Sequence, residues 1–142
     1  MPLSEREFLE VQFMLNHLKA MDDKTDVVIK AANGVMALIV GVIAFLMAFA
    51  PQKLDELSMI AVSIPITSVL LSIISSLLLL YPKFTQLVFF EKEEDFEKIE
   101  ERYYASLRKK TKWMKVTLFW LVLGIISFVS WFMSLAIEVV RH

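Results

Sequence analysis

The sequence predicts an all-α membrane protein: a helical bundle of three transmembrane helices and two amphipathic cytoplasmic helices, forming one membrane domain over residues 1–142. Hydrophobic residues make up 57% of the chain and the mean hydropathy is +0.60, against an apolar content of roughly 45–50% in soluble domains. Three stretches of about 20 uncharged residues are each long enough to cross a hydrocarbon core of roughly 30 Å as a helix. Basic residues gather on the segments that flank these stretches on one side, as in membrane proteins.

The composition gives no support for several classes of function. A net charge of −1 does not favour a nucleic-acid partner, and the absence of cysteine excludes disulfides and thiolate metal sites. The two histidines, His17 and His142, are far apart in the chain, and no HExxH, GxSxG, Walker A or GxGxxG motif occurs. We therefore expect no enzyme activity, no catalytic residue, no metal and no cofactor.

Residues 4–30 are predicted to form a cytoplasmic amphipathic helix that leads into the membrane. Ser4 and Glu7 have the spacing of a capping box. Apolar residues then recur with a 3,4,3 spacing that makes one face of a helix, at Phe8, Val11, Leu15 and Leu18. This face could pack on the rest of the protein or lie on the bilayer surface, although the acidic residues of the same helix disfavour anionic lipid.

Residues 31–50 are the first predicted span. Small residues follow a 3,4,3,4 spacing along it and share one stripe about 80° wide, namely Gly34, Ala37, Gly41, Ala44 and Ala48. In lipid, small residues on one stripe let two helix backbones approach closely. We interpret the stripe as a helix-packing surface, and residues 51–56 as a short turn to the next span.

Residues 58–81 are the second predicted span, whose polar side chains are all hydroxyls. Four of them share one stripe: Ser68, Ser72, Ser75 and Ser76. Two interpretations are open: hydroxyl and small-residue packing between helices, or the lining of a hydrated pore. Pro65 removes one backbone donor and is expected to kink or loosen the helix.

Residues 91–112 are predicted to form the second cytoplasmic helix. Phe96, Ile99, Tyr103 and Leu107 recur on one face with a 3,4,4 spacing. No glycine or proline occurs between Lys83 and Leu123. The helix therefore either ends near its basic C-terminal residues or continues into the last span.

Residues 116–137 are the third predicted span. One stripe combines aromatic, small and acidic residues: Trp120, Gly124, Ser127, Trp131, Ser134 and Glu138. We interpret Gly124, Ser127 and Ser134 as helix-packing positions. A carboxylate inside a membrane would be a functional candidate, but Glu138 is close to the C-terminus, which favours an interfacial carboxylate without a special task.

The distribution of basic residues predicts the orientation. Residues 83–115 and residues 1–30 contain all of the 15 basic residues except Lys53 and Arg141. Three spans place both basic segments on one side, so the N-terminus is expected in the cytoplasm and the C-terminus outside. Residues 48–50 match an A-x-A cleavage pattern, but the acidic amphipathic helix before them is unlike a signal peptide, so the first span is expected to remain.

This arrangement predicts a shape in which both amphipathic helices project from the bilayer into the cytoplasm. Their apolar faces can pair with each other or with copies from neighbouring chains. Three spans enclose little space, so a pore or a stable membrane body is expected to need an oligomer of this chain.

The order of several short motifs resembles the Pycsar-type transmembrane effectors of bacterial antiphage defence. These motifs are Asp22-Asp23-Lys24-Thr25, Asn33-Gly34 in the first span, Tyr81-Pro82-Lys83 after the second, Phe89-Phe90, and a Lys-rich approach to the last span. Members of that family have Asp-x-Lys-Ala where this chain has Asp22-Asp23-Lys24-Thr25. The resemblance covers most of the chain in architecture.

The resemblance implies an antiviral effector of the inner (plasma) membrane. Its trigger would be a cyclic pyrimidine mononucleotide, such as cUMP or cCMP, made by a neighbouring cyclase, and its effect would be an ion leak through an oligomer. Lys24, Lys30 and Arg102 are the candidate ligand-binding residues, because they are basic and on the predicted cytoplasmic side. The alternative is an accessory, structural or channel-like membrane subunit whose cytoplasmic helices dock a partner.

Overall fold

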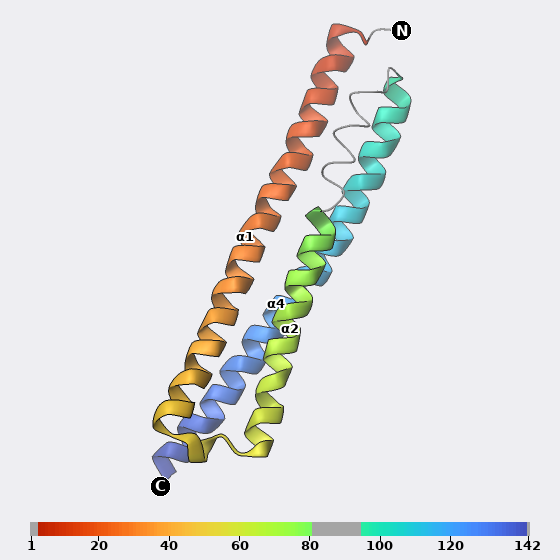
Figure 1. Ribbon diagram of the computed structural model, residues 1–142. Helices are drawn as coiled ribbons and strands as arrows, with labels where there is room; N and C mark the ends of the chain where they lie inside the picture. The colour runs from red at the N-terminus through yellow and green to blue at the C-terminus, as the bar shows by residue number, and fades with distance from the viewer. Residues whose placement is uncertain (1–2, 81–94, 142) are drawn as a thin grey trace.

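The computed structural model describes residues 3–80 and 95–141 and places nearly all of them in helices. Helix α1 spans Glu5–Phe49, α2 spans Glu56–Leu80 and α4 spans Phe96–Arg141, while a short 3-10 helix, η1, covers Pro51–Lys53. Helices α1 and α4 run parallel along the length of the molecule, and α2 runs antiparallel to both (Figure 1). The predictions at Tyr81-Pro82-Lys83, Phe89-Phe90 and the start of the 91–112 helix lie outside the described residues.

Two of the predicted boundaries between a cytoplasmic helix and a span do not interrupt a helix. Residues 5–30 and 31–49 form the single helix α1, and residues 96–112 and 116–137 belong to the single helix α4. With 45 and 46 residues, these helices are roughly 70 Å long at 1.5 Å per residue, about twice the thickness of a hydrocarbon core. Helix α2 has 25 residues, close to the length that one crossing needs.

The N-terminus of α1 has the predicted capping box. The Glu7 backbone N–H donates to the Ser4 hydroxyl oxygen at 3.3 Å, and the Ser4 backbone N–H donates to the Glu7 carboxylate at 2.7 Å. Hydrogen bonds that favour its charged form lower the pKa of Glu7 below its usual value of 4.5. The capping-box prediction is therefore confirmed.

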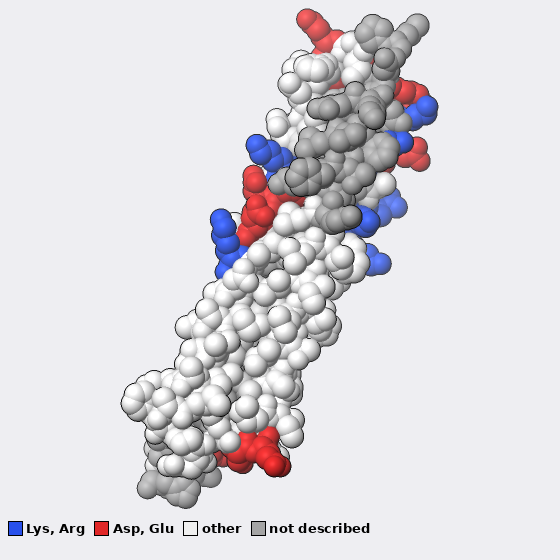
Figure 2. Space-filling model, viewed as in Figure 1, with Lys and Arg blue, Asp and Glu red and all other residues white. Residues whose placement is uncertain are grey.

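The three helices divide into two sections by composition. The charged section comprises residues 5–30 of α1 and 96–115 of α4, and the apolar section comprises residues 31–49, 57–80 and 116–137. Figure 2 shows the apolar section as a broad zone without charged side chains, between the charged section and acidic side chains at the opposite end. All three helices are long and apolar enough to cross a membrane.

Most large apolar side chains of the apolar section point away from the bundle. Phe45, Leu70 and Phe119 are exposed, for example, with 61%, 46% and 61% of their surface accessible. A water-soluble bundle would bury such side chains, since each contributes roughly 1.5–3 kcal/mol when removed from water. The chain is therefore a membrane protein whose apolar exterior suits hydrocarbon.

Helix α2 packs most extensively on α4 and less on α1. Their buried core in the apolar section contains Ala32 and Ile39 of α1, Val62 and Val69 of α2, and Leu121 of α4. Gly124 of α4 lies against α2, because a Cβ placed there would be 2.7 Å from Val69 Cγ2 and 3.4 Å from the Pro65 carbonyl oxygen. Glycine therefore allows the close approach of α2 and α4 at this level.

A second core lies in the charged section, where α1 and α4 pack directly on each other. Met14 and Leu18 of α1 contact Tyr103 of α4, with Phe96 and Leu107 at the edge. The predicted apolar stripe of the 91–112 helix thus faces α1. The sequence left open whether these apolar faces pair with each other or with neighbouring chains, and in this structure they pair with each other.

The predicted apolar face of α1 is partly wrong. Phe8 is 54% exposed, and the face turned to α4 instead carries Val11, Met14, Leu18, Asp22 and Thr25. Their 3,4,4,3 spacing averages 3.5 residues, the period that keeps one face on a parallel partner helix. Phe8 falls outside that face.

Candidate functional site

A buried ion pair joins α1 and α4 at the end of the charged section that borders the apolar section. The Lys110 ammonium donates a hydrogen bond to the Asp22 carboxylate, and the two side chains are only 2% and 5% exposed. Thr25, one turn beyond Asp22, is fully buried and donates its hydroxyl hydrogen to the Met21 carbonyl oxygen at 3.0 Å. Charges this deeply buried are stable only as a pair.

The ion pair lies level with the C-terminal end of α2. The Ser72 hydroxyl donates to the Thr117 carbonyl oxygen at 3.0 Å, which aligns these residues on antiparallel helices. Leu80 lies eight residues beyond Ser72, and Lys110 seven residues before Thr117, so both are roughly 10–12 Å from that level. The pair therefore marks the junction between the apolar section, where α2 is present, and the charged section.

A second polar contact joins α1 and α4 about two turns further into the charged section. The His17 Nδ1 and the Tyr103 hydroxyl are 2.6 Å apart, and their rings are tilted with centroids 6.2 Å apart. Burial raises the pKa of Tyr103 above its usual value of 10.0. The two side chains share one hydrogen bond, whose direction is set by the tautomer of the His17 ring.

The predicted serine stripe of α2 lies in the interface with the other helices. Ser68, Ser72 and Ser76 are buried at 4%, 0% and 0% exposure, and Ser75 is buried beside them. All except Ser72 donate to a carbonyl one turn earlier in α2. The buried Thr117 hydroxyl has no hydrogen-bond partner among the described residues. The stripe therefore forms a polar seam through the apolar section.

The stripe predicted on the last span faces α2 over most of its length. Gly124 and Trp131 are buried, Trp120 and Ser127 are half-buried, and Ser134 and Glu138 are exposed. The Trp131 Nε1–H donates to the Ser58 hydroxyl oxygen at 3.1 Å. Towards the end of the molecule α2 and α4 leave a pocket of about 480 Å³ between them.

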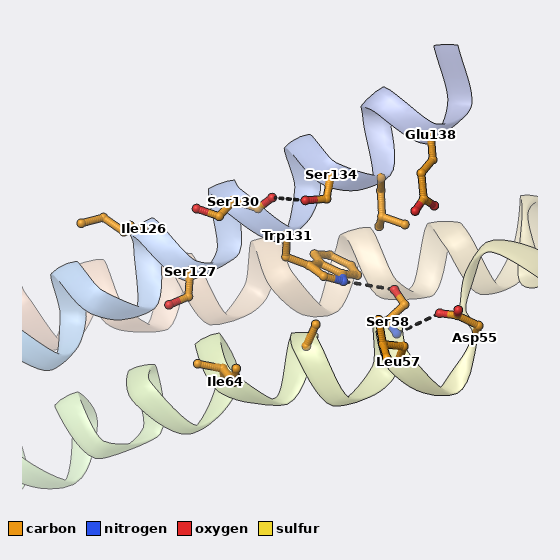
Figure 3. Close-up of a pocket in the computed structure, with 12 residues that line it drawn as sticks. Asp55, Leu57, Ser58, Ile64, Ile126, Ser127, Ser130, Trp131, Ser134 and Glu138 are labelled. Carbon is orange, nitrogen blue, oxygen red and sulfur yellow. Dashed lines mark hydrogen bonds between the residues drawn. The ribbon is translucent and has the colours of Figure 1, made fainter. Parts of the chain in front are cut away.

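Figure 3 shows this pocket, which we call the terminal pocket. Its polar lining consists of the carboxylates of Asp55 and Glu138 and the hydroxyls of Ser127, Ser130 and Ser134, besides the Ser58–Trp131 pair. Glu138 points from α4 towards the N-terminal end of α2. There the Asp55 carboxylate accepts a hydrogen bond of 2.8 Å from the Ser58 backbone N–H.

Within the described part of the chain, no helix packs closely against the two glycines of the small-residue stripe of α1. Its five positions, Gly34, Ala37, Gly41, Ala44 and Ala48, are all exposed. A Cβ at Gly34 or Gly41 would meet no atom within 4 Å. Ala37 and Gly41 border an almost wholly apolar groove of about 650 Å³ between α1 and α4, whose other wall includes Phe132 and Ala136.

The three basic residues predicted to bind a ligand lie at different levels along the bundle. Lys24 and Lys30 of α1 and Arg102 of α4 are all exposed. The His17–Tyr103 and Asp22–Lys110 pairs show which residues of α1 and α4 lie at the same level. At 1.5 Å per residue, Lys24 is about 12 Å along the bundle axis from the level of Arg102, and Lys30 is about 9 Å farther. In residues 3–80 and 95–141, no group of three His, Asp or Glu side chains could hold a metal ion.

Sequence reasoning missed the Asp22–Lys110 pair, although a signal for it was present. The predicted stripe of α4 ends at Leu107, and its next position three residues on is Lys110. The stripe of α1 reaches Leu18, and its next position four residues on is Asp22. Each apolar stripe thus continues into one charge, and the two charges have opposite sign.

Comparisons with protein-family models, with curated proteins and with solved structures give no match to this chain.

Proposed function

We propose that this protein is an oligomeric membrane-permeabilising effector: a cytoplasmic signal reaches the charged section and the spans of several copies repack into an ion leak. The proposal places the chain in the inner membrane, with the N-terminus in the cytoplasm and the C-terminus outside. It takes the trigger, a cyclic pyrimidine mononucleotide such as cUMP or cCMP, from the resemblance to Pycsar-type effectors. The proposal thus makes the chain an antiviral effector.

The observation that carries this proposal is the exposed stripe on α1. Gly34 and Gly41 have open space where a Cβ would point, so a helix of another copy can approach the α1 backbone closely. Association of helices in lipid depends on such packing, because lipid tails are as apolar as leucine. Three helices enclose little space, so the proposed leak requires copies arranged around an axis.

The continuity of α1 and α4 supports the coupling step. Each helix extends from the charged section through the apolar section without interruption. A rotation or shift of the two helices in the charged section is therefore carried directly into the spans, where α2 packs between them. The buried Asp22–Lys110 pair couples the two helices at the junction.

The proposal is tested with the purified chain in liposomes that contain a self-quenching dye. We expect release of the dye when cUMP or cCMP is added, and no release with the corresponding linear nucleotides. Gly41→Leu should abolish or strongly reduce release by blocking close approach at the stripe. Met47→Phe, which enlarges an exposed side chain of α1 outside the stripe, should leave release unchanged. If no cyclic pyrimidine nucleotide causes dye release, the proposal is wrong.

A second candidate, an accessory subunit that docks another protein, is favoured by exposed apolar side chains in the charged section. Phe8, Leu9 and Phe13 are 54%, 64% and 71% exposed, outside the apolar section. A stoichiometric partner that co-purifies with the wild type and is lost with Phe13→Ser, together with no leak, would favour this candidate over the effector.

A further inference from the structure

Two of the serine hydroxyls that line the terminal pocket already donate their hydrogen within α4. Ser127 donates its hydroxyl hydrogen to the Leu123 carbonyl at 2.7 Å, and Ser134 donates to the Ser130 carbonyl at 3.0 Å. Their remaining hydrogen-bonding capacity consists of oxygen lone pairs. Pro65 has no N–H to donate to the carbonyl of Ala61, which lies in the pocket wall.

The charge of the pocket has the same sign throughout its described lining. Asp55 and Glu138 are carboxylates, and no lysine or arginine is among the described residues that line the pocket. The two carboxylates favour a cationic donor over a lone anion. An ammonium group, with several N–H donors, fits this lining.

The surroundings of the pocket indicate where the ammonium group comes from. The apolar walls include Leu57, Ile64 and Ile126, which are 77%, 55% and 59% exposed on the outside of the bundle. The carboxylates lie where the apolar section ends, which is headgroup depth for a bilayer around it. The volume of about 480 Å³ greatly exceeds the roughly 30 Å³ share of a water molecule, so a bare ion would fill little of it.

We infer that the terminal pocket binds the headgroup of a phospholipid that carries a primary ammonium. The ammonium donates to Glu138 near Asp55 and Ser134, and the lipid chains lie along Ile64 and Ile126, which line the pocket farther from its acidic end (Figure 3). This inference goes beyond the proposed leak and needs only the three-span arrangement. Its test measures lipid retention, so it can fail or succeed independently of dye release.

The test is native mass spectrometry of the full chain in detergent, after incubation with equal amounts of three phospholipids that share the same acyl chains. Their headgroups are ethanolamine, choline and glycerol. We expect the wild type to retain the ethanolamine lipid preferentially, because choline has no N–H to donate and glycerol has no positive charge. Glu138→Gln should weaken that retention about tenfold, as expected for the loss of one charge-assisted hydrogen bond.

Two further variants at the same end of the molecule test the site, the first as a control and the second as a change within the pocket. Glu56→Gln removes an exposed carboxylate that does not line the pocket and should retain the ethanolamine lipid like the wild type. Asp55→Asn removes one negative charge from the pocket but keeps a side chain that can cap α2. It should therefore weaken retention of the ethanolamine lipid without loss of helix.

Three outcomes would overturn the inference. Equal retention of the ethanolamine and glycerol lipids by the wild type would exclude recognition of the ammonium. An equal effect of Glu138→Gln and Glu56→Gln would exclude the pocket as the site. Full displacement of the lipid by free ethanolamine or by sodium ions would make a soluble cation, and not a lipid, the ligand.

Discussion

The Asp22 carboxylate of α1 accepts a hydrogen bond from the Lys110 ammonium of α4, and both side chains are almost completely buried. The pair lies level with the end of α2, at the junction of the charged and apolar sections. Because neither charge has access to water, each depends on the other for its solvation. Removal of either partner is therefore expected to lower the free energy of unfolding strongly.

Removal of one member of this pair should strongly destabilise the protein. We expect Asp22→Ala to lower the free energy of unfolding by about 3–5 kcal/mol, because the Lys110 ammonium is left buried without a counter-charge. The measurement is thermal or denaturant unfolding of the purified chain in detergent. Asp23→Ala, which removes the exposed neighbouring carboxylate, is the control and should change stability little.

The double variant Asp22→Leu, Lys110→Met should recover most of the stability lost in Asp22→Ala, since apolar pairs often replace buried ion pairs without loss. If Asp22→Ala unfolds like the Asp23→Ala control, the pair does not hold the junction.

Glycine is required at Gly124 but not at the glycines of α1. Gly124→Ala should destabilise by about 1–3 kcal/mol through overpacking, because its Cβ would lie 2.7 Å from Val69 Cγ2. Gly34→Ala has open space and should be neutral or stabilising for the single chain. Unfolding in detergent measures both, and adding Val69→Ala to Gly124→Ala should relieve the clash. Equal effects of the two alanine substitutions would contradict the close approach of α2 and α4.

Burial of the Tyr103 hydroxyl should make stability depend on pH at alkaline values. The raised pKa of Tyr103 means that its contribution is fully present below the pKa of an unfolded tyrosine, about 10. The contribution is lost as the pH rises through the higher pKa of the folded state. Tyr103→Phe should lower stability by about 1 kcal/mol at neutral pH.

The difference in unfolding free energy between Tyr103→Phe and the wild type isolates this effect from the titration of lysines. That difference should shrink above the folded pKa of Tyr103. A difference that stays constant over the whole alkaline range would show that folding leaves the pKa of Tyr103 unchanged.

The capping box predicts acid-sensitive fraying of the first turn of α1. The lowered pKa of Glu7 means that its contribution is present above 4.5, the usual value, and is lost as the pH falls through the lower folded pKa. Amide hydrogen exchange at residues 5–8, corrected for its intrinsic pH dependence, should lose protection in that range. Glu7→Gln should show a weaker pH dependence, whereas Glu5→Gln, which changes an acidic residue outside the box, should behave like the wild type.

The unpaired hydroxyl of Thr117 should contribute nothing to stability. Thr117→Val keeps the shape of the side chain and removes a buried polar atom without a described partner, so it should be neutral or stabilising by about 1 kcal/mol. Ser72→Ala, in contrast, removes the donor to the Thr117 carbonyl and should destabilise by a similar amount. A marked loss of stability in Thr117→Val would indicate a partner for the hydroxyl, and unfolding in detergent measures both variants.

Three long apolar helices could be predicted because hydrocarbon imposes a simple rule. Runs of uncharged residues such as 58–81 must be helical there, since every backbone N–H and C=O has to be paired within the segment. The capping box at Ser4 and Glu7 was predictable for a related reason, because all of its contacts lie within four residues. Such features depend on local sequence alone.

The contacts between helices could be predicted only in part. The stripe from Phe96 to Leu107 faces α1 as its period indicates, whereas Phe8 does not follow the face that α4 selects. The stripe of small residues on α1 and the serine stripe of α2 look equally suited to packing, yet only the second is buried within the chain. The spacing of residues along a helix shows which of them share a face, but it does not show which helix packs against that face.

The sequence by itself determined that three helices carry enough apolar length to cross a bilayer, because that property is a sum over neighbouring residues. Only the tertiary structure decided that Asp22 meets Lys110, that Gly124 meets α2 and that the stripe of Gly34 and Gly41 stays uncovered. These relationships depend on the rotation and level of each long helix against the next. Many weak contacts along the whole interface set that alignment together, and no single segment encodes it.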